Sequence, residues 1–340
     1  MHYRKPDFYD DFRCIADACP QNCCSAWQVV IDDESLARYR QMPGQIGDAV
    51  RAGIDWQEGC FRRGEGRLCA MQRPDGLCSL QYEAGEQALC FTCAQYPRHT
   101  EEYDGVRELS LALSCPEAAR LLLERTEPLR WAEWDDSLPE SDPDDDWDGF
   151  VYECLLHVRE KILAAAQDRA VPVTERMGRL LAAARELQAC ADDGDIFAME
   201  DVLPGTAAAD DAVSMAVETF DILGTLEVLY TDVWPGMLRA VQTACEQPDY
   251  AEHLAAKAEQ QAIACEQLLV YFLDVYFCGA YYDSAIFART AMAVCGTLWI
   301  VMLGDACGID LQRAARYYDR EIFHSDMNPD DLMTALAKKC

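Results

Sequence analysis

Ten cysteines lie between Cys14 and Cys115, and their thiols are the side chains of this sequence that most clearly point to chemistry. Three of them fall in the stretch CPQNCCSAW at residues 19–27, where Cys23 and Cys24 are adjacent. Adjacent cysteines pair poorly with each other because disulfide geometry is restrictive. No apolar export signal is visible, and clustered thiols in a reducing compartment more often bind metal. The cluster therefore predicts a metal site, with a disulfide framework as the alternative.

The spacing of these cysteines leaves the kind of metal open. Only Cys90 and Cys93 form a C-x2-C pair, so the zinc pattern of two such pairs is absent. A C-x3-C-x2-C spacing of the radical type starts at Cys19 and Cys23 but has Ala26 in its third position. Four thiolates can hold either an iron–sulfur cluster or a zinc ion. Spacing alone does not choose between them.

The other eight cysteines are scattered singly through a region rich in alanine and leucine. They are Cys154, Cys190, Cys245, Cys265, Cys278, Cys295, Cys307 and Cys340. Isolated thiols on helices usually behave as small buried apolar side chains. We expect no metal chemistry from this second set.

Two turns are expected to position residues of the cysteine-rich part. A Pro-Asp-Gly turn at residues 74–76 separates Cys69 from Cys78, and a tight turn brings its two flanks together. These two thiols can therefore approach one ion. Farther along, the sequence EEYDGVRELSLAL predicts a β-hairpin around Asp104 and Gly105.

A helix is predicted to start within SCPEAARLLLER. Ser114 and Glu117 have the spacing of a capping box, and Pro116 suits the first helical turn. Cys115 then lies at the helix N-terminus, where the helix dipole favours the thiolate. A buried cap residue without chemistry is the alternative interpretation of Cys115.

The predicted fold class is mainly α: a small irregular cysteine-rich metal-binding lobe with short strands, followed by an all-helical domain. The lobe is expected over residues 1–130 and the helical domain over residues 149–340, where apolar residues recur at helical spacing. An acidic, proline-containing linker is expected between them, at residues 131–148.

An aromatic-rich segment opens the predicted helical stretch from residue 266 to residue 303. Its aromatic residues are Tyr271, Phe272, Tyr276, Phe277, Tyr281 and Tyr282. Such a stripe is usually part of the core, but it could also line a pocket for an alkyl chain.

The composition limits the classes of partner. The formal net charge of −31 would repel phosphate backbones, so no nucleic-acid partner is expected. The longest apolar run, Thr290 to Gly304, is shorter than the roughly 18 to 20 residues of a membrane span. We therefore expect a cytoplasmic protein with no membrane span.

The usual catalytic motifs are missing from the sequence: no phosphate-binding glycine loop, dinucleotide fingerprint or H-E-x-x-H motif occurs.

The cysteine-rich part resembles the flagellin lysine N-methylase family. The resemblance lies in four segments, DFRCIADACPQNCCSAWQVVID, LCAMQRPDGLCSL, CAQYPR and LALSCPEAARLLL, within residues 7–125. It also shares the style of zinc- or iron-chelating cysteine-cluster proteins. The resemblance implies a [4Fe-4S] cluster held by cysteines, and methyl transfer from S-adenosylmethionine to lysine side chains of flagellin.

The resemblance also implies a set of metal ligands. The matching positions are Cys14, Cys19, Cys23, Cys24, Cys69, Cys78, Cys93 and Cys115. Cys90 is an addition to the pattern. Eight thiols exceed the four that one cluster needs, so some have a structural role or a second metal binds. The resemblance favours iron–sulfur over zinc, which stays the alternative metal.

Methyl transfer to lysine makes two further demands. The amine must lose a proton, and taking lysine from its reference pKa of about 10.4 to neutral at pH 7 requires about 4.6 kcal/mol. A desolvated aromatic channel lowers that pKa, and a tyrosine or carboxylate could accept the proton. No catalytic residue is assigned from sequence. A non-catalytic metal-cluster protein that binds a partner is the alternative function.

Arg98, in the stretch CAQYPRHT, is the one predicted cofactor-binding residue. Its guanidinium could neutralise a thiolate-rich site or bind a cofactor carboxylate. An ordinary surface ion pair is the alternative interpretation of this residue.

Overall fold

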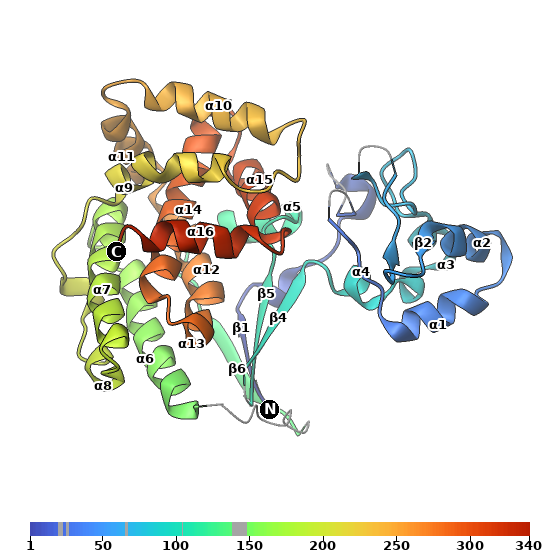
Figure 1. Cartoon of the computed structure of the whole chain (residues 1–340), viewed down its shortest axis with the longest axis horizontal. Helices are drawn as coiled ribbons and strands as arrows, with labels where there is room; N and C mark the ends of the chain where they lie inside the picture. The colour runs from blue at the N-terminus through green and yellow to red at the C-terminus, as the bar shows by residue number, and fades with distance from the viewer. Residues whose placement is uncertain (20–22, 25–26, 65–66, 104, 138–147) are drawn as a thin grey trace.

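The computed structural model describes residues 1–19, 23–24, 27–64, 67–103, 105–137 and 148–340. Most of the described chain is helical, with one four-stranded and one two-stranded sheet. Figure 1 shows a large helical body and, beside it, a smaller lobe that carries α1 to α4. The predicted fold class of a mainly α protein is therefore confirmed.

The four-stranded sheet lies along the helical body. It consists of β1 (His2–Pro6), β4 (Arg98–Tyr103), β5 (Val106–Leu111) and β6 (Trp131–Asp135), in the order β4-β5-β1-β6. The β1–β5 pair is parallel, and the β1–β6 and β4–β5 pairs are antiparallel. The predicted hairpin around Gly105 is confirmed, and Gly105 itself has a φ of +71°. Its neighbour Asp104 lies outside the described residues.

The sheet includes the start of the segment predicted as an acidic linker, residues 131–148. Its first five residues form β6, which pairs with β1 along its whole length. Trp134 stacks on Tyr3 across this pair, with ring centroids 5.0 Å apart. The acidic residues 138–147 lie outside the described residues. Sequence reasoning overlooked the strand because its two tryptophans stand among acidic residues.

Among the described residues, twelve α-helices make up the body. They are α5 (Pro116–Leu123), α6 (Gly149–Ala166), α7 (Val173–Asp192), α8 (Ile196–Met199), α9 (Ala212–Thr219), α10 (Trp234–Cys245), α11 (Tyr250–Gln260), α12 (Ala262–Tyr276), α13 (Ala280–Asp283), α14 (Ile286–Cys307), α15 (Leu311–Phe323) and α16 (Asn328–Ala337). Helix α14 is apolar on all sides and contacts α7, α9, α10, α12, α15 and α16. A helix of this kind forms the centre of a core.

Two segments of the body are long and apolar enough to cross a membrane by length and composition alone. They are Ala262–Asp283 and Ile286–Cys307. In the second segment, 94% of an apolar stretch of 18 residues is buried inside the protein. In the first segment, the buried share of such a stretch is 61%. A central core helix passes the same test of length and composition. The absence of a membrane span stays a prediction.

The lobe has a small hydrophobic core of its own. Its elements are α1 (Asp33–Gln41), α2 (Gly44–Gly53), β2 (Ile54–Asp55), β3 (Cys60–Phe61), α3 (Ser79–Ala84) and α4 (Phe91–Gln95). Asp32 caps α1 by accepting a hydrogen bond from the Ser35 backbone N–H at 2.8 Å. Around Tyr39, the side chains of Val50, Phe61 and Leu80 are buried, and Cys90 packs with them.

Six short 3-10 helices connect the described elements: Tyr9–Asp11, Ala16–Ala18, Glu86–Ala88, Pro204–Thr206, Phe220–Gly224 and Phe277–Gly279.

The two end segments of the region predicted as the lobe, residues 1–130, pack in the helical body. Phe8 and Phe12 before the lobe, and Leu111 and Leu122 after it, belong to the core of the helical body. The segment that packs around Tyr39 is therefore shorter than residues 1–130.

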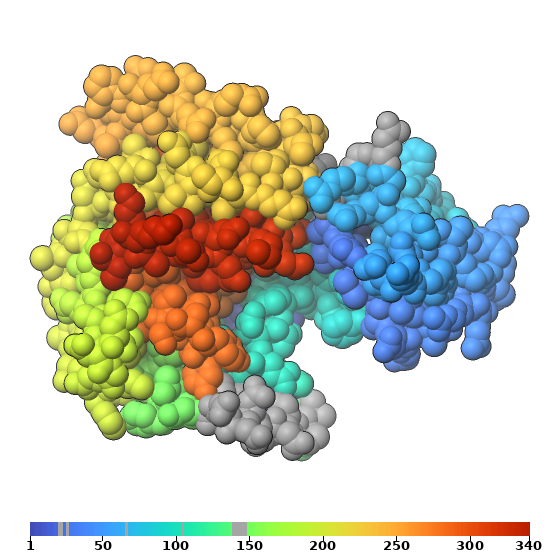
Figure 2. All heavy atoms as spheres, in the orientation of Figure 1, coloured from blue at the N-terminus to red at the C-terminus, as the bar shows by residue number. Residues whose placement is uncertain are grey.

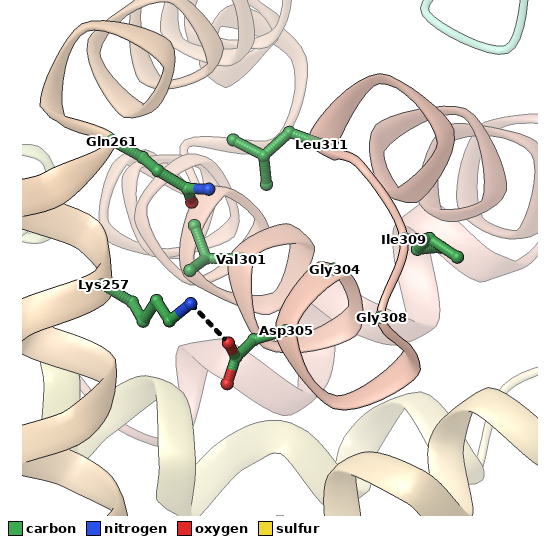
Figure 3. A pocket seen from close by; sticks show the side chains of 8 residues that line it. All are labelled: Lys257, Gln261, Val301, Gly304, Asp305, Gly308, Ile309 and Leu311. Atoms are coloured by element: carbon green, nitrogen blue, oxygen red, sulfur yellow. Dashed lines mark ion pairs between the residues drawn. The ribbon is translucent and has the colours of Figure 1, made fainter.

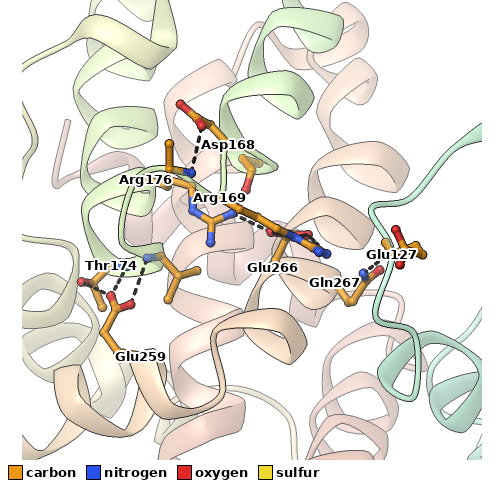
Figure 4. A network of polar contacts seen from close by, with 11 residues as sticks. Glu127, Asp168, Arg169, Thr174, Arg176, Glu259, Glu266 and Gln267 are labelled. Atoms are coloured by element: carbon orange, nitrogen blue, oxygen red, sulfur yellow. Dashed lines mark hydrogen bonds and ion pairs between the residues drawn. The ribbon is translucent and has the colours of Figure 1, made fainter.

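A buried ionic network joins α12 to α7 and to the loop between α6 and α7 (Figure 4). Glu266 is fully buried and lies 2.8 Å from both Arg169 Nη2 and Arg176 Nη1. Arg176 also donates a hydrogen bond to the Ala166 carbonyl oxygen at 2.5 Å. The neighbouring Gln267 donates to the Glu127 carbonyl oxygen at 2.9 Å. One turn of α12 therefore holds two distant segments in place.

We predict that Glu266→Gln lowers the free energy of unfolding by about 3 kcal/mol, because two arginines then face a neutral amide in the interior. Urea denaturation followed by circular dichroism measures the change. The matched control is Glu124→Gln, which removes an exposed carboxylate paired with Arg120, and its effect should stay within about 0.5 kcal/mol. Equal effects of the two substitutions would contradict the prediction.

Candidate functional site

Six thiols of the lobe lie close enough for their charges to interact. They are Cys23, Cys24, Cys69, Cys78, Cys90 and Cys93. The Sγ atoms of Cys23 and Cys24 are 3.9 Å apart. The Cys69 backbone N–H donates a hydrogen bond to the Cys24 carbonyl oxygen at 3.1 Å, which brings the two chain segments together. Five of the eight predicted ligands therefore meet in one group, together with Cys90.

Hydrogen bonds and burial give these thiols unequal acidities. The hydrogen bond from Cys24 lowers the pKa of Cys23 to about 7, and the one from Cys93 lowers that of Cys90 to about 7. Burial raises the pKa of Cys69 to about 11. Thiolate, the form that binds metal, is therefore easiest to reach at Cys23 and Cys90. Metal binding by this group would release protons.

The donor type of this group fits a thiolate-bound metal, since soft thiolates suit zinc and iron–sulfur clusters. Within the part of the chain that the structure describes, no three His, Cys, Asp or Glu side chains converge as ligands of one ion. The thiols are thus neighbours without forming a closed coordination shell. Which of them bind a metal stays a prediction.

Of the three remaining predicted ligands, Cys19 and Cys115 interact through their charges, and Cys115 also interacts with Cys23 of this group. Cys14 is exposed. Cys115 is the N-cap of α5 in the helical body, and the charges of Cys19 and Cys23 reach it. Burial raises the pKa of Cys115 to about 11, so desolvation outweighs the helix N-terminus that was expected to favour its thiolate. Ser114 is not the cap residue that sequence predicted.

Sequence reasoning set Cys90 aside, whereas the structure places it inside the thiol group. Cys90 is fully buried, and its thiol interacts with Cys93 three residues later. The signal was present, because these two cysteines form the C-x2-C pair of the chain. The scattered cysteines follow expectation more closely: Cys154, Cys265, Cys278 and Cys295 are buried in the helical body.

A cavity of about 580 Å³ opens between the lobe and the helical body. Its walls come from α4 and β4 on one side and from the ends of α12 and α15 on the other. The space-filling view shows the lobe standing beside the body with a hollow between them (Figure 2). Tyr276 and Phe323 stack in the wall, with ring centroids 4.4 Å apart, and Tyr271 adjoins them. Part of the predicted aromatic stripe therefore lines a cavity.

Ser114 links the polar groups of this cavity. Its backbone N–H donates to Asp319 Oδ2 at 2.7 Å, and its hydroxyl accepts from the Tyr96 hydroxyl at 3.1 Å. The same Ser114 Oγ lies 2.9 Å from His324 Nε2. Asp319 is 1% exposed, and its other oxygen, Oδ1, has no hydrogen-bond partner within the part of the chain that the structure describes. This carboxylate is therefore buried and oriented by the Ser114 backbone N–H, and its Oδ1 atom lies unpaired among the described residues.

Burial shifts the titration of the cavity's ionisable groups. Desolvation raises the pKa of Asp319 to about 6, and it holds the pKa values of Tyr271 and Tyr276 well above their usual value. Desolvation, with the charge of Arg320, lowers the pKa of His324 to about 3. A carboxyl group that titrates near neutral pH is suited to proton transfer.

Arg98 lines the same cavity, as its predicted role requires. Its guanidinium lies 5.1 Å from the centroid of the Phe12 ring. None of the described carboxylates forms an ion pair with Arg98, so the alternative of a surface ion pair finds no partner there. Binding of a cofactor by Arg98 stays a prediction.

Helix α15 carries a set of buried charges that sequence reasoning missed. Arg316, Asp319, Arg320 and Glu321 are each between 1% and 3% exposed. Charged side chains are almost never fully buried unless they are paired or functional. A charge run in a sequence usually indicates a solvated helix face. The signal that could have found the site is the mixing of these charges with the aromatic residues of RYYDREIF.

A second cavity, of about 240 Å³, lies at the C-terminal end of α14 (Figure 3). Its charged groups are already paired: Asp305 lies 2.9 Å from Lys257 Nζ and 2.7 Å from His253 Nε2. Among the described residues, the charged side chains that line this cavity are therefore already paired with each other or with a neighbour. The larger cavity next to the thiols is the stronger candidate for a functional site.

The described geometry defines a mainly helical protein with a thiol-rich lobe and a cavity at its junction with the body. Comparison with known proteins adds three similar sequences from Salmonella, each 28% identical to this chain over about 35% of its length. One is named flagellar biosynthetic protein FliU, from Salmonella muenchen, and the match covers 75% of it. Two are named lysine-N-methylase, from Salmonella choleraesuis and Salmonella typhimurium, and the match covers 32% of each.

The match is therefore partial, spanning about a third of this chain and about a third of each lysine-N-methylase. No family model matches the chain. No solved structure matches it either. The names of these three proteins support, at a coarse level, the predicted relationship to flagellar lysine methylases.

We predict that acid weakens the folded state through His324. Its pKa is about 3 when folded and about 6.5 when unfolded, so the unfolded chain binds the extra proton between these values. Stability is therefore complete above pH 6.5 and is lost as pH falls. Between pH 7 and pH 5 this loss is about 2 kcal/mol, at 1.36 kcal/mol per pKa unit.

The measurement is urea denaturation at both pH values, for the wild type and for His324→Gln. The variant should lose about 2 kcal/mol less than the wild type over this interval, because its amide does not titrate. His157→Gln, which changes an exposed histidine on α6, is the control. Identical pH dependence in wild type and His324→Gln would contradict the assignment.

Proposed function

We propose that this protein is a lysine N-methyltransferase that uses S-adenosylmethionine and modifies flagellin. The names of the similar Salmonella proteins support lysine as the target and a flagellar protein as the substrate. The observation that carries the proposal is the unpartnered Oδ1 atom of the buried Asp319, at the wall of an aromatic cavity. A target lysine needs such a proton acceptor in such a surrounding.

The target lysine enters the cavity as an ammonium group. The stacked rings of Tyr276 and Phe323 attract its positive charge, while the loss of water lowers its pKa. Asp319 Oδ1 takes a proton from Nζ and leaves a lone pair on the nitrogen. That lone pair forms a bond with the methyl carbon of S-adenosylmethionine, and the carbon–sulfur bond breaks with its electrons staying on sulfur. The products are a methylated lysine and S-adenosylhomocysteine.

Arg98 would hold the carboxylate of S-adenosylmethionine, since it lies in the cavity wall without an ion-pair partner among the described residues. Positioning of this kind matters because the lysine nitrogen must come within roughly 3 to 3.5 Å of the methyl carbon, in line with the bond that breaks. The Ser114 N–H holds Asp319 in one orientation for the same purpose.

The thiol group of the lobe would hold the metal of the proposed enzyme, a [4Fe-4S] cluster with zinc as the alternative. The ligands would come from Cys23, Cys24, Cys69, Cys78, Cys90 and Cys93, with Cys19 and Cys115 at the edge. Bound metal would cross-link the loops of the lobe that stand at the cavity. We place the protein in the cytoplasm, where reducing conditions keep these thiols available.

We predict that Asp319→Asn reduces methyl transfer by about 100-fold or more, because the amide cannot accept the proton. Purified protein is incubated with methyl-labelled S-adenosylmethionine and flagellin, and label on lysine is counted. Wild-type activity should fall below about pH 6, where Asp319 is protonated. The control is Asp330→Asn, an exposed position on α16, which should leave the rate unchanged.

No label on lysine from the metal-loaded wild type would remove the enzyme proposal. It would leave the second candidate, a metal-binding protein that recognises a partner, which is favoured by the lobe having a hydrophobic core apart from the cavity. Full activity in Asp319→Asn would retain the enzyme and exclude the proposed proton acceptor.

We also predict that Cys69→Ser and Cys78→Ser each lower the metal content of anaerobically prepared protein at least severalfold, since each removes one donor. Elemental analysis for iron and zinc, with absorbance near 400 nm, measures content and identifies the metal. The control is Cys295→Ser, because this thiol is buried in α14 far from the lobe in the fold. A colourless protein that contains zinc would replace the iron–sulfur assignment.

A further inference from the structure

The four-stranded sheet ends in a strand that has a neighbour on one side only. In the order β4-β5-β1-β6, β4 pairs with β5 alone. Figure 1 shows β4 on the side of the sheet toward the lobe. An edge strand presents a row of backbone N–H and C=O groups to which another extended chain can bond. The outer edge of β4 is therefore a surface on which a further strand can pair.

One hydrogen bond of the β4–β5 pair fixes which residues of β4 face outward. The Ala112 backbone N–H donates to the Pro97 carbonyl oxygen at 2.9 Å, and the same register continues along the whole pair. In an antiparallel pair, every second residue bonds to its cross-strand partner. The backbone groups of Arg98 and Thr100 therefore point away from β5. Within the described residues, they bond to no other segment either.

The outer edge of β4 adjoins the large cavity. Arg98, His99, Thr100 and Glu101 all contribute to the cavity wall, and His99 and Thr100 are exposed. The other edge strand of the sheet, β6, contributes no residue to this wall. A strand laid along β4 would therefore run beside the cavity.

One face of β4 and β5 is directed into the cavity. His99 and its cross-strand partner Ser110 share this face with the pair of Glu101 and Glu108. Glu108 bonds to Arg159 of α6 at 2.6 Å, so the face is turned to the helical body. Successive side chains of a strand alternate between the two faces of a sheet. Every second side chain of a strand added to β4 would therefore point toward the same cavity.

The charges of the cavity favour a cationic side chain. Its wall includes three carboxylates, those of Glu101, Asp319 and Asp326. Arg98 supplies its one guanidinium, and none of the described lysines lines it. The stacked rings of Tyr276 and Phe323 add to the attraction for a cation. A lysine side chain is therefore complementary to this cavity.

We propose that the substrate polypeptide binds as an added strand along the outer edge of β4, which directs its lysine into the large cavity. The outward backbone groups of Arg98 and Thr100 hold the polypeptide by hydrogen bonds, whatever its sequence, and the cavity adds the preference for lysine. The identity of the substrate rests on the proposed function, whereas this mode of binding does not. A lysine in an extended segment is thus selected over a lysine in a helix.

The test measures the binding of peptides to the full chain without any methyl donor. Short overlapping peptides of flagellin, each containing a lysine and a fluorescent label, are titrated with the protein, and fluorescence anisotropy gives Kd. Thr100→Pro removes the outward N–H and leaves the bonds of its neighbours to β5 in place, since proline is tolerated on the open side of an edge strand. Thr100→Ala, which keeps the N–H, is the matched control.

We expect Thr100→Pro to weaken binding of the tightest peptide about 10-fold, because one hydrogen bond is lost and a peptide carbonyl is left unpaired. Thr100→Ala should bind like the wild type. A second measurement uses the wild-type protein and versions of that peptide methylated at single backbone nitrogens. Methylation should weaken binding at every second residue, since only alternate N–H groups of an added strand face β4.

Circular dichroism first establishes that both variants fold. Wild-type binding by a folded Thr100→Pro would overturn the proposal, and so would a wild-type chain that binds none of the peptides. If Thr100→Pro does not fold, the methylated peptides decide: weaker binding at alternate residues supports the proposal, and equal effects at all residues overturn it.

The same samples separate this proposal from the proposed function. A peptide that binds in the expected way but accepts no label from S-adenosylmethionine would remove the enzyme and leave the docking edge. Label transfer to lysine with an unchanged KM in Thr100→Pro would keep the enzyme and overturn the docking edge.

Discussion

The hydrogen bond from the Ser114 backbone to the Asp319 carboxylate holds the candidate site together. Ser114 stands between β5 and α5, Asp319 belongs to α15, and the Ser114 hydroxyl also joins Tyr96 and His324. Segments separated by about two hundred residues of chain therefore meet at one serine. Because Asp319 is desolvated there, its acidity becomes a property of the tertiary fold. The aromatic walls, the thiol loop and the buried arginines are all arranged around this contact.

The parts of the fold that local signals determine were predictable. The Asp32 cap of α1 and the hairpin around Gly105 follow from side-chain hydrogen bonding and turn conformation, which act over a few residues. The strand β6 was missed because the strand with which it pairs, β1, lies more than a hundred residues away in the sequence. Packing of Phe8 and Leu122 into one core likewise depends on contacts between segments far apart in sequence.

The candidate site was predictable to a smaller extent. The family resemblance implied five of the six cysteines that the structure brings together, and Arg98 does lie in the cavity wall. The buried residues of α15 were not predicted because a sequence does not show whether a charged side chain is buried or exposed. Only the packed structure distinguishes the buried Asp319 and Arg316 from the exposed charged residues of this chain, whose net charge is −31.

The division of the molecule into two hydrophobic cores has a consequence for the cavity. One core surrounds Tyr39 in the lobe and the other surrounds α14, and their buried residues form two separate clusters. The space between them is therefore set by how the two parts meet, and the contacts there include Trp27 against His324 and Arg67 against the Leu229 carbonyl oxygen. A slight tilt of the lobe would widen or narrow the opening while both interiors stay intact, so the packing of the two cores does not by itself fix the width of the cavity mouth.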